Sequence, residues 1–346
     1  MREGAERHTG RRKGRSRLLV GLLSLATAVG LVGVTAGEAG ARINDTPLFK
    51  EYRINSCGMP NFTSGPWKNK SAGEADGVKV RTWKKQGNYK TVILLDGMRA
   101  EYGYSGWEIN TNVQKLVNAG VNVVQPVGGP ASFYADWDAP SNFNAQPFTY
   151  KWRCVITRSL IRTLDANGFR VGNGKYAIMG LSSGGGAALT IAAQNRQNFD
   201  RAASLSGYNW MTAPGMRTAI RLSMLDISPS PFNVDSMFGP PWSPRWRSND
   251  AAWNIQGLRG MKVYVGSGNG IVGQHSFDGG SSSMSLFNDV FKGAPLELLS
   301  FTQTKAFELF ANLNGVPVMS SYAMGTHSWG YWQDMVWDAK NRGFFR

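Results

Sequence analysis

The sequence predicts an α/β fold in which a mostly parallel sheet is covered by helices on both faces. Short apolar runs alternate with helix-like segments from about residue 75 to the C-terminus, which is typical of such sheets. One junction is especially informative. A strand-like run over 175–179 leads into Gly-Leu-Ser-Ser-Gly at 180–184, and a small-residue, helix-like stretch follows over 185–198.

The other elements follow from apolar runs bounded by Gly, Pro, Asn or Asp. We expect strands over 78–83, 91–95, 121–126, 202–205, 261–266 and 316–321. We expect helices over 111–119, 152–167, 283–292, 305–314 and 331–341. The aromatic, Pro- and Asn-rich segment 133–148 is expected to be loop, and 206–257 a long insertion with helical pieces. Residues 42–80 suggest an irregular arm or edge strands.

Ser182 is the candidate nucleophile of the Gly-x-Ser-x-Gly pattern. A serine at a sharp strand-to-helix turn exposes its hydroxyl at the end of the sheet. Glycines two positions before and after it remove side chains that would block the turn. Ser183 is a weaker candidate because Leu181 lies two positions before it. The alternative is a Gly/Ser loop that merely connects strand and helix.

A serine needs a base, and in α/β-hydrolases an acid and then a histidine follow the nucleophile along the chain. His327 lies between the last predicted strand and the closing helix, where this fold places its histidine, whereas His275 lies in an earlier Gly/Ser-rich loop. The acid has to orient the imidazole. The residue pattern leaves Asp278 and Glu297 nearly equal as that acid, and the full set of candidates is Asp278, Asp289, Glu297 and Glu308.

The loop after the predicted strand 91–95 is expected to supply the second donor of an oxyanion hole. It comprises Asp96, Gly97, Met98 and Arg99. The backbone amides of Met98 and Ser183 are the natural pair of donors. Asp96 and Arg99 either form a structural ion pair or bind a polar substrate such as a sugar.

The N-terminal segment has the features of a signal peptide. Basic residues at 11–17 precede an apolar stretch over 18–34, and small residues follow at 39–41. We expect cleavage after Ala41, which leaves an arm over 42–74 and one catalytic domain over 75–346. A retained membrane anchor is the alternative. The signal peptide predicts an exported protein of the cell envelope, and no later segment is apolar enough to span a membrane.

The amino-acid composition indicates which classes of binding partner are favoured. The formal net charge is +15, with the basic residues scattered and without a nucleic-acid-binding motif, which favours anionic envelope polymers over nucleic acid. In an exported protein, Cys57 and Cys154 most simply form one disulfide, and two unrelated buried thiols are the alternative. Nothing suggests a metal ion, because the sequence has no Cys/His cluster.

Several long stretches of this sequence resemble the antigen-85-type mycolyltransferases, which are secreted acyltransferases of mycolic-acid bacteria. The resemblance runs from about residue 75 to the C-terminus. It is carried by Leu-Leu-Asp-Gly-Met-Arg-Ala (94–100), Ser-Gly-Trp-Glu-Ile-Asn-Thr (105–111), Pro-Val-Gly-Gly (126–129), Ser-Phe-Tyr-Ala-Asp-Trp (132–137), Tyr-Lys-Trp (150–152), Gly-Leu-Ser (180–182) and Gly-Thr-His-Ser-Trp (325–329).

The resemblance implies an α/β-hydrolase fold with Ser182 as nucleophile and His327 as base. It also favours Glu297 as the acid, because Phe307 follows ten residues later. The matching amides of Met98 and Ser183 form the family's oxyanion hole. The positions that match the family's trehalose contacts are Asp96, Arg99, Trp329 and, more weakly, Asn110.

The implied reaction is a double displacement without a cofactor. A mycoloyl group passes from trehalose monomycolate to the serine and then to a sugar hydroxyl of a second trehalose monomycolate or of arabinogalactan. The aromatic segments 133–137 and 210–211 either shelter the lipid or belong to the core. A secreted carboxylesterase and a non-catalytic binding protein of the cell wall are the rival functions.

The sequence also departs from the family pattern. Val265 stands where mycobacterial members often have a cysteine, and Gly330 replaces an acidic residue between two tryptophans. A short disulfide common in the family's loop at 138–148 is missing, and the arm with Cys57 has no clear counterpart. These differences indicate a divergent member.

Overall fold

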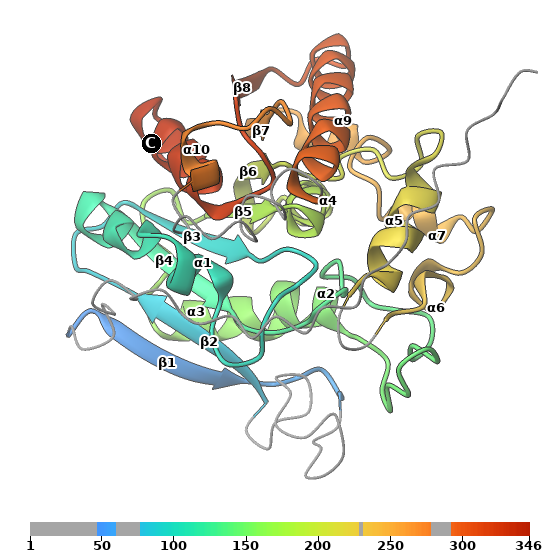
Figure 1. Ribbon diagram of the computed structural model, residues 1–346. Helices are drawn as coiled ribbons and strands as arrows, with labels where there is room; N and C mark the ends of the chain where they lie inside the picture. Colours follow the sequence, from blue (N-terminus) through green and yellow to red (C-terminus); the bar gives the residue numbers. More distant parts are fainter. Residues whose placement is uncertain (1–46, 60–76, 228–230, 278–291) are drawn as a thin grey trace, which may run out of the picture. The chain divides into compact units, whose positions relative to one another are not determined.

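The computed structural model describes residues 47–59, 77–227, 231–277 and 292–346, all of which lie in one compact unit (Figure 1). Within these ranges eight strands form one sheet in the order β1-β2-β4-β3-β5-β6-β7-β8. The strands are β1 (Phe49–Ile54), β2 (Val78–Trp83), β3 (Lys90–Leu95), β4 (Val121–Pro126), β5 (Tyr176–Leu181), β6 (Phe199–Leu205), β7 (Lys262–Gly268) and β8 (Val318–Ala323). All pairings from β4 through β8 are parallel, whereas β2 pairs antiparallel with both β1 and β4.

Side chains alternate between the two faces of the sheet, and each face has its own apolar core. In β3, Val92 and Leu94 belong to one core, and Ile93 and Leu95 to the other. The first core also contains residues of α1 (Gly106–Asn110), of the 3₁₀ helix Val113–Ala119 and of α10 (Trp329–Asn341). The second contains residues of α3 (Ile161–Ala166), α4 (Ser183–Gln194) and α9 (Ala294–Leu313). The predicted α/β fold with two covered faces is confirmed.

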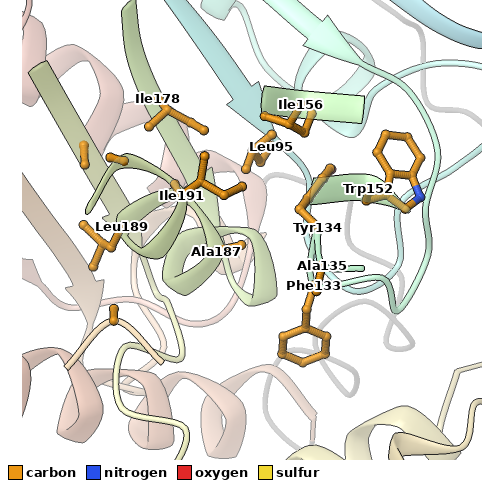
Figure 2. Close-up of a cluster of buried hydrophobic side chains, with 14 of the residues drawn as sticks. Leu95, Phe133, Tyr134, Ala135, Trp152, Ile156, Ile178, Ala187, Leu189 and Ile191 are labelled. Atoms are coloured by element: carbon orange, nitrogen blue, oxygen red, sulfur yellow. The ribbon is translucent and has the colours of Figure 1, made fainter. Parts of the chain in front are cut away.

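The second core brings α4 against the middle of the sheet. Leu189 and Ile191 of this helix belong to the same buried apolar cluster as Ile178 of β5 (Figure 2). Ala187 lies nearer the beginning of α4, on the side of the loop that carries Phe133. Because α4 follows β5 directly, this packing fixes the turn between them.

Most predicted elements are present with shifted ends. Residues 152–166 are helical as expected, through α2 (Trp152–Cys154), a π-helical turn (Val155–Leu160) and α3. Residues 113–119 are 3₁₀ rather than α-helical and end at Gly120, whose φ of 93° suits glycine. The late helix begins earlier than predicted, because α9 starts at Ala294.

The insertion after β6 contains the helical pieces that the sequence predicts. They are α5 (Met216–Leu225), α6 (Val234–Phe238), α7 (Arg245–Ser248) and the 3₁₀ helix Ile255–Leu258. A further 3₁₀ helix follows β7 at Gln274–Phe277. The predicted helix over 283–292 falls, except for its last residue, outside the described residues.

The aromatic segment Phe133–Trp137 belongs to the core. Phe133, Tyr134 and Trp137 are almost completely buried, and Trp137 packs edge-on against Tyr150 at a centroid distance of 5.3 Å. Met211 is buried as well. Of the two roles that the sequence leaves open for these residues, the structure supports core packing.

Part of the N-terminal arm is an edge strand, because β1 lies at the end of the sheet beside β2. The predicted signal peptide at 1–41 and most of the remaining arm lie outside the described residues. Within the described ranges no helix combines the length and the apolar character needed to cross a bilayer.

The predicted disulfide between Cys57 and Cys154 is confirmed. It joins the segment after β1 to α2, and 97 positions of sequence separate its two cysteines. The alternative of two unrelated thiols is thereby excluded.

Replacing both cysteines by serine should lower the free energy of unfolding by about 4–5 kcal/mol, because the cross-link restricts a long loop in the unfolded chain. Urea unfolding of the native protein, with and without reductant, and of the double variant measures this. The reduced native protein should unfold like the variant. An unchanged midpoint after reduction would contradict the expectation.

Candidate active site

Ser182 occupies a strained turn between β5 and α4. Its φ of 52° and ψ of −126° are unusual for a residue with a side chain, and it is the N-cap residue of α4. The strands beside β5 are β3 and β6, so Ser182 lies at the carboxyl end of the central part of the sheet. The first amides of α4 have no acceptor within the helix, and they favour negative charge at this point.

The two glycines of the motif allow this turn because backbone approaches them closely. A methyl group at Gly180 would overlap the carbonyl oxygen of Gly184. A methyl group at Gly184 would overlap the carbonyl oxygen of Asp96, in the loop after β3. Both glycines of the motif are therefore needed for this turn, as the sequence predicts, and the second one also allows the β3 loop to approach the start of α4.

Glu297 and His327 form a buried hydrogen-bonded pair. The Nδ1–H group of His327 donates to Oε2 of Glu297 at 2.7 Å. The side chain of Glu297 has no exposed surface and that of His327 is 10% exposed. A carboxylate on Nδ1 leaves Nε2 as the nitrogen that can accept a proton.

The other oxygen of Glu297 is saturated by donors from two strand ends. Oε1 accepts from the hydroxyl of Ser206 at 2.6 Å, from the hydroxyl of Ser267 at 2.9 Å and from the amide of Gly268 at 2.5 Å. Glu297 also lies in the first turn of α9, where the helix dipole favours a negative charge. The arrangement holds the Glu297 carboxylate in place against the imidazole.

Trp332 of α10, which belongs to the apolar core that also contains α1, contacts the Glu297–His327 pair. Its ring meets that of His327 edge-on at a centroid distance of 4.9 Å. Its indole N–H donates to Ser206 at 2.9 Å, and Ser206 in turn donates to Glu297. The imidazole is therefore held by the carboxylate and by an aromatic ring that belong to one hydrogen-bond network.

Ser182 is connected to this network through the end of β6. Its amide donates to the carbonyl of Leu205 at 2.8 Å, and the next residue is Ser206. One strand end thus contacts both the serine turn and the carboxylate. The predicted nucleophile and the Glu297–His327 pair lie at neighbouring strand ends of the same sheet.

The loop after β3 lies directly beside Ser182. A methyl group at Gly97 would be 3.2 Å from Cβ and 3.7 Å from Oγ of the serine. Met98, the next residue, is fixed by its carbonyl, which accepts from the amide of Ala131 at 2.9 Å. Ser183 begins α4 on the other side. The structure thus brings together the two segments that carry the predicted oxyanion-hole amides.

Asp96 is a fully buried carboxylate whose oxygens accept no hydrogen bond of normal geometry. The Ser105 hydroxyl and the amides of Gly106 and Trp107 face it, yet neither carboxylate oxygen has a partner at normal hydrogen-bond geometry. Burial raises its pKa from 3.8 to about 7, and these donors only partly oppose that rise. The carboxyl group therefore titrates close to neutral pH.

Asp96 and Trp329 lie on either side of Gly106. A methyl group at Gly106 would be 3.2 Å from Oδ1 of Asp96 and would overlap the edge of the Trp329 indole. That indole packs edge-on against Trp107 at 5.7 Å. Two of the four residues predicted to contact a sugar are therefore adjacent.

Arg99 and Asn110 are arranged differently from the other two. Arg99 forms an ion pair with Asp226, at the end of α5, at 2.8 Å, so an Asp96–Arg99 ion pair is wrong. Both partners are more than half exposed, and such a pair contributes little stability. Asn110 is exposed and donates to the carbonyl of Gly106 within its own helix.

The structure also shows the hydrogen-bond partners of the less favoured candidates for the base and the acid. His275 is hydrogen-bonded through Nε2 to Asp334 at 2.7 Å and packs against Tyr331 rather than Trp332. Glu308 accepts from Ser320 and Tyr322, both at 2.6 Å. The remaining candidates for the acid, Asp278 and Asp289, lie outside the described residues.

The residues that hold the acid in place are not evident from the sequence. Ser206 has a φ of 49°, and a serine just after a strand end, followed by glycine, is at most a weak local signal for such a position. Nothing in the local sequence singles out Ser267. Trp332 could have been noticed, because it lies in the first turn of the helix that follows His327.

Known proteins resemble this chain over most of its length. Residues 71–342 match the sequence profile of the esterase family. The diacylglycerol acyltransferase/mycolyltransferase Ag85C of Mycobacterium leprae is 32% identical over 328 residues, which cover 93% of this chain and 89% of the relative. Ag85A of Mycobacterium tuberculosis, of the same description, is 33% identical over 320 residues, covering 91% and 87%.

Solved structures agree on the fold. MPT51 (FbpC1) of Mycobacterium tuberculosis superposes with a TM-score of 0.63 at 22% identity, covering 82% of this chain and all of that one. The fluorophosphonate-binding serine hydrolase FphF of Staphylococcus aureus superposes with a TM-score of 0.56 at 13% identity, covering 86% and 98%. The α/β-hydrolase fold is thereby confirmed. By its profile match and its relatives, this chain belongs to the esterase family and, within it, to the antigen-85-type mycolyltransferases.

Proposed function

We propose that this protein is a serine acyltransferase that moves a mycoloyl group from trehalose monomycolate to another sugar hydroxyl. The acyl group would be carried by Ser182. The observation that supports this most is the buried hydrogen bond between Glu297 and His327, at the strand ends that neighbour the strained serine turn. The antigen-85 relatives are acyltransferases by name, which supports the same chemistry.

In the first half of the reaction, Ser182 attacks the ester carbonyl while Nε2 of His327 takes the serine proton. Glu297 holds the imidazole and stabilises its positive charge. The amides of Met98 and Ser183 receive the developing oxyanion. His327 then returns the proton to the sugar oxygen as trehalose leaves.

The departing and accepting sugars would bind beside Asp96 and Trp329. A buried carboxyl that lacks hydrogen-bond partners gains most from sugar hydroxyls that supply them. Arg99 can add a contact, because its exposed ion pair with Asp226 costs little to rearrange. Asn110 is the least favourably placed of the four.

In the second half, a sugar hydroxyl replaces water as the acceptor. A bound, oriented acceptor has a large effective concentration over one that arrives by collision. The acceptor would be a second trehalose monomycolate or arabinogalactan. Export through the segment 1–41 would place the enzyme at the envelope where these molecules occur.

A carboxylesterase is the second candidate, and the family match favours it. Mass spectrometry of products from trehalose monomycolate, with and without added acceptor, separates the two. Transfer gives dimycolate or the acylated acceptor, whereas an esterase releases free mycolic acid in both conditions.

Ser182→Ala should abolish product formation, with a loss of at least about 10³-fold in kcat, because no acyl-enzyme can form. Ser183→Ala is the matched control and should remain active, since only its backbone amide is used. Turnover by the Ser182→Ala protein at the native rate would remove the basis of the proposal.

Glu297→Gln should lower kcat by about 10³–10⁴-fold without unfolding the protein. All four groups around this carboxylate are donors, so an amide NH₂ there would oppose one of them and favour the wrong tautomer of His327. Glu308→Gln, in the same helix, is the control and should keep native kcat. Similar kinetics of the two variants would argue against Glu297 as the acid.

The raised pKa of Asp96 predicts a pH-dependent stability. Between its ordinary pKa of 3.8 and its folded value of about 7, the folded state holds a proton that the unfolded state has lost. The free energy of unfolding therefore falls as pH rises through this window, by up to about 1.4 kcal/mol per pH unit from this group. Asp96→Asn should flatten that slope in urea titrations, and an unaltered slope would show that Asp96 ionises normally.

A further inference from the structure

The imidazole of His275 lies against Gly330, in the first turn of α10. A methyl group at Gly330 would overlap the Cγ atom of the ring, and it would be 2.7 Å from Cβ and Nδ1. Gly330 lies inside a helix, where glycine is unfavourable, and its φ is not positive. Glycine is therefore needed here for room and not for backbone shape. This chain departs from the family pattern at Gly330, and an acidic side chain there could not share the space with the imidazole.

Two further contacts hold His275 on the same helix. Its Nε2–H group donates to Oδ2 of Asp334 at 2.7 Å, and its ring meets that of Tyr331 edge-on at a centroid distance of 5.0 Å. Asp334 is four residues beyond Gly330, on the same face of α10. The side chain of His275 is only 17% exposed. The imidazole therefore fills the space over Gly330, between Tyr331 and Asp334.

The 3₁₀ helix Gln274–Phe277 also touches the loop of the proposed base. The hydroxyl of Ser276, which is 3% exposed, hydrogen-bonds with the hydroxyls of Tyr331 at 3.2 Å and Thr326 at 3.4 Å. Thr326 is the residue before His327. The same short helix therefore contacts both the start of α10 and the residue that precedes the base.

The first turn of α10 carries two indoles of the proposed site. The ring of Trp332 meets that of His327 edge-on at 4.9 Å. Trp329, the indole proposed to lie beside the sugars, packs edge-on against Trp332 at 5.1 Å. Both belong to the turn that includes Gly330. A shift of this turn would move both indoles, and the contact with the imidazole of the base would change with them.

We propose that His275 is a positioning residue of the acyl-transfer reaction. By occupying the space over Gly330 and bonding to Asp334, it fixes the first turn of α10 and so the orientation of His327 and Trp329. It takes no part in the proton transfers itself. The inference rests on the proposed function, because it requires His327 to be the base.

The test is a double-mutant cycle on the two residues in contact, with 4-nitrophenyl butanoate as substrate. His275→Ala should lower kcat by about 10–100-fold, since a misplacement of about 1 Å costs as much as about 10²-fold. Gly330→Ala should have a similar effect, because its methyl group displaces the imidazole. Adding Gly330→Ala to His275→Ala should cost nothing further, since the space is then empty. KM should stay within about twofold, because orientation of the base is lost and not binding.

Two variants serve as controls. Gly103→Ala adds a methyl group where nothing lies within 4 Å, so it should keep the native kcat. His275→Gln supplies an amide that can still donate to Asp334, and it should recover part of the activity lost in His275→Ala. Every kcat is expressed per serine titrated with a fluorophosphonate, so that unfolded protein is not counted.

The outcomes separate this inference from the proposed function. A native kcat per titrated serine in His275→Ala would overturn it, and so would additive effects of the two substitutions. Variants that lose only stability to urea would overturn it too, since the contact would then support the fold and not the base. If the native protein neither labels nor cleaves the ester, Ser182 or His327 is misassigned, and the role of His275 fails with them.

Discussion

One buried carboxylate organises the site. Glu297 accepts hydrogen bonds from the ends of β6 and β7 and from the loop that carries His327. A carboxylate removed from water is tolerated only when its oxygens are satisfied. Here the same contacts that satisfy it also fix the relative positions of two strand ends, a helix start and the imidazole. The stability of the charge and the geometry of the proposed base are therefore one constraint.

The fold could be predicted from the sequence because its signals are local. Alternating apolar runs located six parallel-sheet strands, and the motif around Ser182 predicted a turn in which Gly180 and Gly184 have no room for a methyl group. The type of the 113–119 helix and the start of α9 were not predictable in this way. Helix ends depend on packing against the sheet more than on propensity.

The site was predictable only in part. The residue pattern alone did not identify the acid. Its partners Ser206 and Ser267 lie at the ends of two strands that are far apart in sequence, and only the pairing of these strands brings both to Glu297. The Asp96–Arg99 ion pair failed for a similar reason, since the partner of Arg99 is Asp226, 127 positions later. Sequence spacing could not show that Asp96 lacks a partner or that Trp329 lies beside it. Such features depend on tertiary contacts that have no local signature.

The disulfide has a consequence for the integrity of the chain under proteolysis. Since it joins Cys57 to Cys154, a single cut anywhere between these positions cannot release the N-terminal fragment. The nicked molecule would migrate as one species in electrophoresis until a reductant separates its pieces. The edge strand β1, which precedes Cys57 and pairs with β2, would remain tethered close to its partner after such damage.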